Sequence, residues 1–459
     1  MSAVALEKLR AAATPARRPG EGRDPVPFTR YPKYKDSEIP WIGEIPADWT
    51  IRPLVGIACE CDEPNTGMRE SDLLSLSYGS IVPKDMTSND GLLPESFETY
   101  QIVQPDDIVL RLTDLQNDKR SLRSAIVKEP GIITSAYLAI RSRNIEPSFL
   151  AYLLRSYDLT KVFYSMGGGL RQSMKFAEMK RLPVLVPSSE EQTAIAAFLD
   201  REIAKIDALI EEQEKLIALL KEKRQALISH AVTKGIDPNA PMKDSGIEWL
   251  GQVPAHWELK PLKYLVTLQS GGTPDKSNPD YWDGTIPWAS AKDIKVEVLR
   301  DTEDHITDAA VVGGAASMAP AGAVVVVVRG MILARTFPVT LLANPMAINQ
   351  DLKALRVANS AESRFLAWYL RGTANESLTR LDEAGHGTKA LRMGSWSSLM
   401  IASPSVDEQC VIADYLEARM HQIDDLVIES EHAINLLKER RAALISAAVT
   451  GKIDVRQAA

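Results

Sequence analysis

The sequence predicts an α+β chain of two globular domains, separated by a long antiparallel intramolecular coiled coil of two repeated helices. Residues 190–237 return without a gap as residues 407–454, with roughly half of the aligned positions identical. Upstream, KDSEIPWIGEIPADW at 35–49 returns as KDSGIEWLGQVPAHW at 243–257, and we call these two stretches the start segments. The repeats are offset by 407 − 190 = 217 and 243 − 35 = 208 residues, so the second variable part is longer. Between these shared stretches the two halves look unrelated.

Both repeated stretches carry apolar residues in alternating steps of four and three, which is the 3.5-residue period of a left-handed coiled coil. Polar residues interrupt this seam at the same two places in each copy, Gln213 or Ser430 and Arg224 or Arg441. Such residues fix the register of a helix pair at a cost in stability. The predicted seam consists of Leu199, Ile203, Ile206, Ile210, Ile217, Leu220 and Leu227 in the first helix, and of Leu416, Met420, Ile423, Val427, Ile434, Leu437 and Leu444 in the second.

The simplest arrangement pairs the two helices with each other in antiparallel order, which would hold the domains at opposite ends of a rigid rod. Pairing with another protein, or with a second copy of the chain, fits the same seam. Further apolar residues lie beside the seam, and we interpret them as room for a partner protein. They are Leu209, Leu216, Ile228, Leu426 and Ile445.

The variable parts mix short β-like runs with turn signals, and each also contains one helix-like segment, at 147–157 and 363–372. Runs in the second part include 324–329, 331–334 and 352–357. The predicted division of the chain is a mobile N-terminal tail (1–30), a first domain (31–187), its helix (188–235), a linker with the second start segment (236–256), a second domain (257–404), its helix (405–451) and a tail (452–459).

Composition indicates a water-soluble chain of the reducing cytoplasm, with 45% hydrophobic and 25% charged residues and only three cysteines. No secretory leader opens the sequence, and its longest apolar run is too short to cross a bilayer. The net charge of −8 does not by itself favour nucleic acid, although the variable parts contain locally basic stretches. We expect no metal site, because Cys59 and Cys61 lack a second ligand pair at zinc spacing.

Gly-rich turns with basic and amide residues lie in both variable parts, at 167–175 and 385–392. Flexible glycine beside such side chains suits close approach to phosphates and base edges, although an ordinary loop before a strand has the same composition. Motifs for nucleotide binding, metalloprotease, serine hydrolase or kinase chemistry are not found. The sequence therefore predicts a protein that binds and does not catalyse.

The chain from about residue 30 to 454 resembles the DNA-specificity subunit of type I restriction-modification systems. The resemblance rests on the Trp-x-Gly-x-[Ile/Val]-Pro-x-x-Trp pattern of both start segments and on the Glu-Gln-x-x-Ile-Ala pattern at both helix starts. The stretches 271–288 (GGTP…YWDGTIPW) and 349–353 (NQDLK) are also similar to motifs of that family.

The resemblance implies a non-catalytic subunit whose two target-recognition domains each read one half of a bipartite, asymmetric DNA site, while the helices set the unread spacer. It implies two modification subunits that carry S-adenosylmethionine and methylate adenine, and two restriction subunits, the motor-nucleases, that use ATP and Mg. No cofactor is expected on this chain itself, and no membrane partner.

Because members diverge in these domains, contact residues for double-stranded DNA are chosen on physical grounds, as basic or amide side chains of the basic stretches and Gly-rich turns. The choices are Lys119, Arg120, Arg123, Arg171, Gln172 and Lys175 in the first domain, and Lys276, Lys292, His386, Lys389 and Arg392 in the second. The alternative function is a coiled-coil assembly scaffold that does not read DNA.

Overall fold

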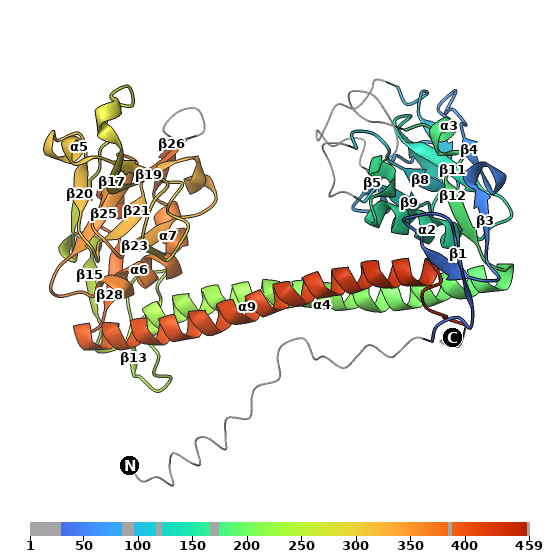
Figure 1. Ribbon diagram of the computed structural model, residues 1–459. Helices are drawn as coiled ribbons and strands as arrows, with labels where there is room; N and C mark the ends of the chain where they lie inside the picture. The colour runs from blue at the N-terminus through green and yellow to red at the C-terminus, as the bar shows by residue number, and fades with distance from the viewer. Residues whose placement is uncertain (1–28, 85–95, 116–121, 166–173, 384–387, 457–459) are drawn as a thin grey trace, which may run out of the picture. The chain divides into compact units, whose positions relative to one another are not determined.

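A computed structural model gives the fold of the chain (Figure 1). The residues that it describes are 29–84, 96–115, 122–165, 174–383 and 388–456. The predicted N-terminal tail, apart from its last two residues, lies outside them.

The chain divides into two compact units, one of Met1–Glu212 with Ala433–Ala459 and the other of Gln213–His432. Each unit holds one α+β domain and a stretch of both long helices, α4 (Ser189–Lys234) and α9 (Val406–Val449). The first stretch of α4 therefore shares a unit with the last stretch of α9, and the reverse holds in the other unit. The predicted α+β class with an antiparallel pair of repeated helices is confirmed.

The first domain is built from short antiparallel strands around a four-stranded sheet of order β4-β11-β8-β9. The members of this sheet are β4 (Ala58–Cys61), β11 (Leu138–Ser142), β8 (Ile108–Leu110) and β9 (Ser124–Ile126). Three two-stranded pairs flank it: β3 (Thr50–Pro53) with β12 (Pro183–Val186), β5 (Leu74–Ser77) with β6 (Ser80–Pro83), and β7 (Gln101–Val103) with β10 (Gly131–Ile133). The helices α2 (Pro147–Leu159) and α3 (Phe176–Met179) complete the domain.

The second domain contains two larger sheets, one of five strands and one of four, and each sheet has both parallel and antiparallel pairs. The order of the first is β16 (Val266–Ser270), β25 (Leu352–Val357), β21 (Val324–Val327), β23 (Val339–Leu342) and β18 (Val298–Leu299). The order of the second is β19 (Asp304–Ile306), β17 (Trp282–Ala289), β24 (Met346–Ile348) and β20 (Ser317–Ala319). The domain also contains a two-stranded sheet of β15 (Glu258–Pro261) and β28 (Met400–Ser403), and a three-stranded sheet of order β22 (Arg329–Gly330), β27 (Lys389–Leu391) and β26 (Leu381–Glu383). Its helices are α5 (Asp308–Val312), α6 (Ser363–Gly372), α7 (Ala374–Leu378) and α8 (Met393–Trp396).

The prediction of a strand at 331–334 is wrong, because Met331–Ala334 forms a 3₁₀ turn. The strand of four buried valines before it, β21, ends at Val327, and Gly330 adopts φ +148°, a conformation that side chains rarely allow. The chain therefore turns at a place where the apolar pattern of the sequence predicts a further strand. The predicted helix-like segments correspond to α2 and to α6, and α6 has the predicted bounds.

Each start segment forms a small hairpin, β1 (Tyr34–Asp36) with β2 (Glu44–Pro46) and β13 (Met242–Asp244) with β14 (Gln252–Pro254). In the first unit this hairpin packs on the end of α9: Tyr34 Oη donates to the carbonyl of Gly451 over 3.0 Å. A Cβ at Gly451 would lie 2.4 Å from Cδ of Pro46, and φ there is +71°, so the contact requires glycine. In the second unit the corresponding hairpin follows α4 directly in the chain.

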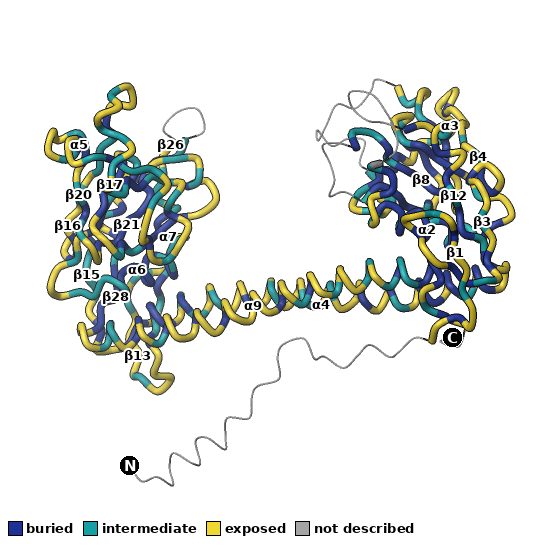
Figure 2. Tube along the Cα trace, viewed as in Figure 1, coloured by how far each residue is buried: buried dark blue, intermediate teal, exposed yellow. Residues whose placement is uncertain are grey.

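Burial is concentrated within each domain and on the helix ends beside it, while the middle of α4 and of α9 is mostly exposed (Figure 2). In the first unit the buried core joins Trp49, Phe149 of α2, Leu199 of α4 and Ala448 of α9 in one cluster. The long helices are therefore part of each domain's hydrophobic core at their ends, which anchors them far more firmly than a coiled-coil seam alone.

Candidate nucleic-acid interface

The glutamine of the Glu-Gln pair at each helix start has a structural role that is the same in both units. The side-chain carbonyl of Gln192 accepts the backbone N–H of Glu146, and its amide donates to the carbonyl of Pro187 over 2.9 Å. Gln409 makes the equivalent two bonds, to Glu362 and Pro404, and is fully buried. The glutamine thus connects the end of the last strand, the start of the long helix and the start of the domain helix.

The helix pair has one register in both units. In the first unit Arg441 lies 3.3 Å from Asp207, and in the second Arg224 lies 3.5 Å from Asp424. The paired numbers have the same sum, 207 + 441 = 648 and 224 + 424 = 648, as an antiparallel pair without a register shift requires. The two arginines that interrupt the seam are therefore satisfied by carboxylates of the opposite helix.

All predicted seam residues are buried or half-buried, whereas the predicted flanking positions divide into two groups. Leu209, Leu216 and Leu426 are 41–48% exposed, as room for a partner requires. Ile228 and Ile445 are buried, and Ile228 packs beside Gly372 of α6. The prediction that these two isoleucines serve a partner is therefore wrong, since they hold the chain's own domains.

Among the DNA-contact candidates of the first domain, Arg123 is buried completely. Its guanidinium donates to the carbonyls of Arg111 and Thr113, over 3.1 and 2.7 Å, and to Oη of Tyr164. This arginine connects loops of its own domain and is not accessible to DNA. Its prediction as a DNA contact is therefore wrong. Lys175 is exposed at the start of α3. The others, Lys119, Arg120, Arg171 and Gln172, lie outside the described residues.

In the second domain, Lys276 and Lys292 line one cleft of about 360 Å³. Lys292 lies 2.9 Å from carboxylate oxygens of both Glu303 and Asp304, and these hydrogen bonds raise its pKa. Lys276 is exposed. The other lining residues are Thr273, Trp288, Ser290, Asp304, Asn349, Gln350 and Asp351.

This cleft brings together two sequence motifs that lie far apart in the chain, 271–288 and 349–353. The side-chain hydroxyl of Thr273 donates to Oε1 of Gln350, and the indole N–H of Trp288 donates to the carbonyl of Gly272 over 3.0 Å. Sequence reasoning noticed both motifs as family markers but did not choose Thr273, Asn349 or Gln350 as contacts. An Asn-Gln pair beside a lysine was the signal, since amides and lysine are the side chains that pair with base edges.

The remaining candidates do not line this cleft. Lys389 lies in β27, with Nζ 2.5 Å from a carboxylate oxygen of Glu383 in β26, and Arg392 lies 3.5 Å from Asp382. His386 lies outside the described residues. Within the described part of the chain, no group of three or more His, Cys, Asp or Glu side chains is placed to hold a metal ion.

A family model described as "Type I restriction modification DNA specificity domain" matches residues 124–219 and 254–436, more than half of the chain. The chain belongs to this family. It is therefore the component that provides DNA sequence specificity in a restriction-modification system, and it is not the catalytic one. DNA and the methyltransferase and restriction subunits are the partners of such a component.

Among similar proteins, the EcoR124I/EcoR124II specificity subunit of Escherichia coli is 24% identical over 62% of this chain and 66% of its own length. The putative MjaX specificity subunit of Methanocaldococcus jannaschii is 22% identical over 94% of this chain and 98% of its own. The HsdS subunit from Thermoanaerobacter tengcongensis has the same fold, with a TM-score of 0.53 at 18% identity, over 89% of this chain and 98% of its own. A chain solved in a study of complex assembly in the type I R-M system gives 0.62, also at 18% identity, over 88% and 98%.

The described helices of this specificity subunit include none that is both long and apolar enough to span a membrane.

Proposed function

We propose that this specificity subunit reads a bipartite, asymmetric DNA sequence, with one half-site for each domain. The observation that carries the proposal is a duplicated frame with two unlike domains: the glutamine bridges and the arginine register are the same in both units, while the sheets and the candidate surfaces differ. Two different surfaces on one repeated frame suit two different half-sites. Base edges in the major groove would supply discrimination, and phosphate contacts would fix the position of each domain.

The antiparallel helix pair would set the length of DNA between the half-sites. A helix of 46 residues, as α4 is, spans about 69 Å at about 1.5 Å per residue. Each domain shares a hydrophobic core with the helix ends of its own unit, so the pair and the domains would move together. Polar residues in the seam disfavour a slipped register, which would change the spacing.

Two modification subunits would bind along the exposed leucines of the helices, such as Leu209 and Leu426, which are 47% and 48% exposed. These subunits would carry S-adenosylmethionine and methylate adenine N6. Two restriction subunits, with ATP and Mg, would cleave unmodified DNA. We place the assembled complex in the cytoplasm, where its DNA substrate is.

For DNA contacts in the second domain we propose Lys276 for phosphate and Gln350 of the same cleft for a base edge. Lys292 would contact phosphate only in exchange for Glu303 and Asp304. Lys389 and Arg392 would contact phosphate only in exchange for Glu383 and Asp382. Lys175 is proposed for the first domain. Lys119, Arg120, Arg171, Gln172 and His386 stay proposals of the same kind.

The test is to produce the chain with its modification subunit and to map every methylated adenine on DNA of random sequence. The proposal predicts two short sequence blocks with an unread spacer of one fixed length. Substituting the first domain should change one block and leave the other unchanged. Methylation without sequence preference, by a complex that still assembles, would support a scaffold and contradict the proposal.

A further inference from the structure

The two units contain an equivalent arginine pair. The domain helices α2 and α6 share an aligned stretch, SFLAYLLR at 148–155 and RFLAWYLR at 364–371. It ends in Arg155 in the first unit and in Arg371 in the second, and both arginines are at least half-buried by their surroundings. Next to each lies the seam arginine of a long helix, Arg441 or Arg224.

Both buried arginines donate to backbone carbonyls at equivalent places. Arg371 Nη2 donates to the carbonyl of Glu297 over 2.6 Å, and Arg155 Nη2 donates to the carbonyl of Gly79 over the same distance. Gly79 therefore occupies in the first unit the position that Glu297 occupies in the second.

The side chain at this position differs in a way that changes the charge. The carboxylate of Glu297 binds the seam arginine Arg224, which also contacts Asp424. Gly79 has no side chain, so Arg441 keeps Asp207 alone as a carboxylate partner among the described residues. A Cβ on Gly79 would lie 2.4 Å from Nη1 of Arg155, and φ is +80°, so the chain itself cannot place a carboxylate from here.

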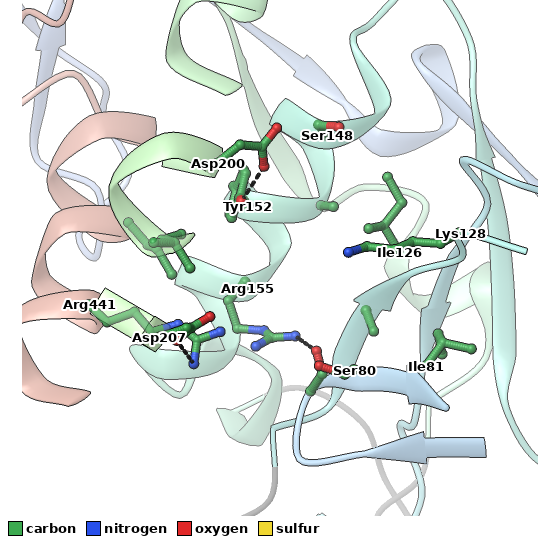
Figure 3. Close-up of a pocket in the computed structure, with 15 residues that line it drawn as sticks. Ser80, Ile81, Ile126, Lys128, Ser148, Tyr152, Arg155, Asp200, Asp207 and Arg441 are labelled. Atoms are coloured by element: carbon green, nitrogen blue, oxygen red, sulfur yellow. Dashed lines mark hydrogen bonds and ion pairs between the residues drawn. The ribbon is translucent and has the colours of Figure 1, made fainter. Parts of the chain in front are cut away.

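A cavity of about 280 Å³ occupies this place in the first unit (Figure 3). Arg155, Arg441 and Lys128 line it, together with Ser80. Its two carboxylates are engaged, since Asp207 pairs with Arg441 and Asp200 accepts the hydroxyl of Tyr152 over 2.6 Å. Burial lowers the pKa of Arg155 to about 10, against the effect of Asp158, which lies one turn further along α2 and does not line the cavity.

We propose that this cavity binds a small oxyanion, a carboxylate or phosphate group, which takes the place that the Glu297 carboxylate has in the second unit. Arg155 would contribute Nη1, for which the described residues provide no acceptor, and Arg441 would contribute its guanidinium. Planar guanidinium groups pair with carboxylate and phosphate through two parallel hydrogen bonds. The oxyanion is either a free anion in solution or an Asp or Glu side chain of the modification subunit.

The experiment uses the full chain and three variants. Ser80→Glu supplies a carboxylate at the rim of the cavity, and Ser80→Gln is the uncharged match at this exposed position. Glu297→Ala opens the equivalent place in the second unit. Calorimetric titration with inorganic phosphate at constant ionic strength should give one site per chain, at least tenfold weaker in Ser80→Glu, unchanged in Ser80→Gln, and two sites in Glu297→Ala.

The second arm measures assembly with the modification subunit. If the oxyanion is a partner side chain, phosphate does not saturate, whereas Ser80→Glu weakens assembly at least tenfold and Ser80→Gln leaves it intact. This result supports the proposal as well, and sequence mapping of methylation separates it from failure of the DNA-reading function. The proposal is overturned if Ser80→Glu changes neither phosphate binding nor assembly, or if phosphate saturates one site with the same affinity in all three variants and in the native chain.

Discussion

At the scale of single residues, polar side chains that are buried here connect elements, whereas some of those that are exposed in clefts can meet a ligand. Gln409 and Arg123 are of the first kind, because each satisfies several backbone groups in a buried place. Lys276 is of the second kind. Residue type alone does not separate the two kinds, which is why Arg123 was chosen from the sequence as a DNA contact and proved to be internal.

Gln409→Ala should lower the free energy of unfolding by about 1–3 kcal/mol, because it leaves the N–H of Glu362 and the carbonyl of Pro404 buried without their partner. Denaturant unfolding of the full chain measures this change. Gln422→Ala, at an exposed position of the same helix, is the matched control and should change stability by less than about 0.5 kcal/mol. Equal effects of the two substitutions would contradict the bridging role.

Lys276→Ala should weaken binding of the assembled complex to all DNA sequences alike and reduce the slope of log affinity against log salt by about 1, since one phosphate contact is lost. Gln350→Ala should instead cost about 1–3 kcal/mol on the cognate site and relax one base of the motif. Lys260→Ala, in β15, serves as control. Binding curves at several salt concentrations distinguish the cases, and an unchanged salt slope in Lys276→Ala would refute the phosphate contact.

At the scale of elements, the repeated helices were predictable because the spacing of their apolar seam residues can be seen directly in the sequence. The strands of the domains were predictable in part: β25 has the predicted bounds, whereas the run after β21 forms a turn because of Gly330. The cleft around Lys276 could not be located from the sequence, since it depends on a strand order that pairs Trp288 of β17 with Ala347 of β24, across 59 residues of chain (347 − 288 = 59). The burial of Ile228 and Ile445 could not be predicted from the sequence either, because it depends on how each domain packs on the long helices.

Leu199→Ala and Leu209→Ala should separate the two faces of α4. Leu199 is fully buried in the domain core, so its truncation should cost about 2–5 kcal/mol of unfolding free energy. Leu209 is 47% exposed, so its truncation should change stability little but weaken binding of the modification subunit. Unfolding curves and a pull-down of the complex measure these effects. If Leu209→Ala binds the modification subunit like the native chain, this face is not the docking surface.

At the scale of the whole molecule, the chain is two copies of one plan, in which a start segment, a domain and a long helix are held together by repeated contacts. What evolved apart is the set of sheets and side chains that each domain presents, together with the residue beside its buried arginine, Gly79 or Glu297. A frame that stays constant while its inserts diverge suits recognition of two unrelated DNA sequences at a set distance.

The most direct test of this account is to lengthen both helices by three heptads, at positions opposite one another, after Gln213 in α4 and before Asn435 in α9 (213 + 435 = 648). Twenty-one residues add about 32 Å, close to one turn of DNA, so both domains should face the groove as before. Mapping of methylated adenines should show the same two half-sites with a spacer longer by about nine base pairs. An unchanged spacer, in a complex that assembles and methylates, would contradict the claim that the helix pair measures the distance.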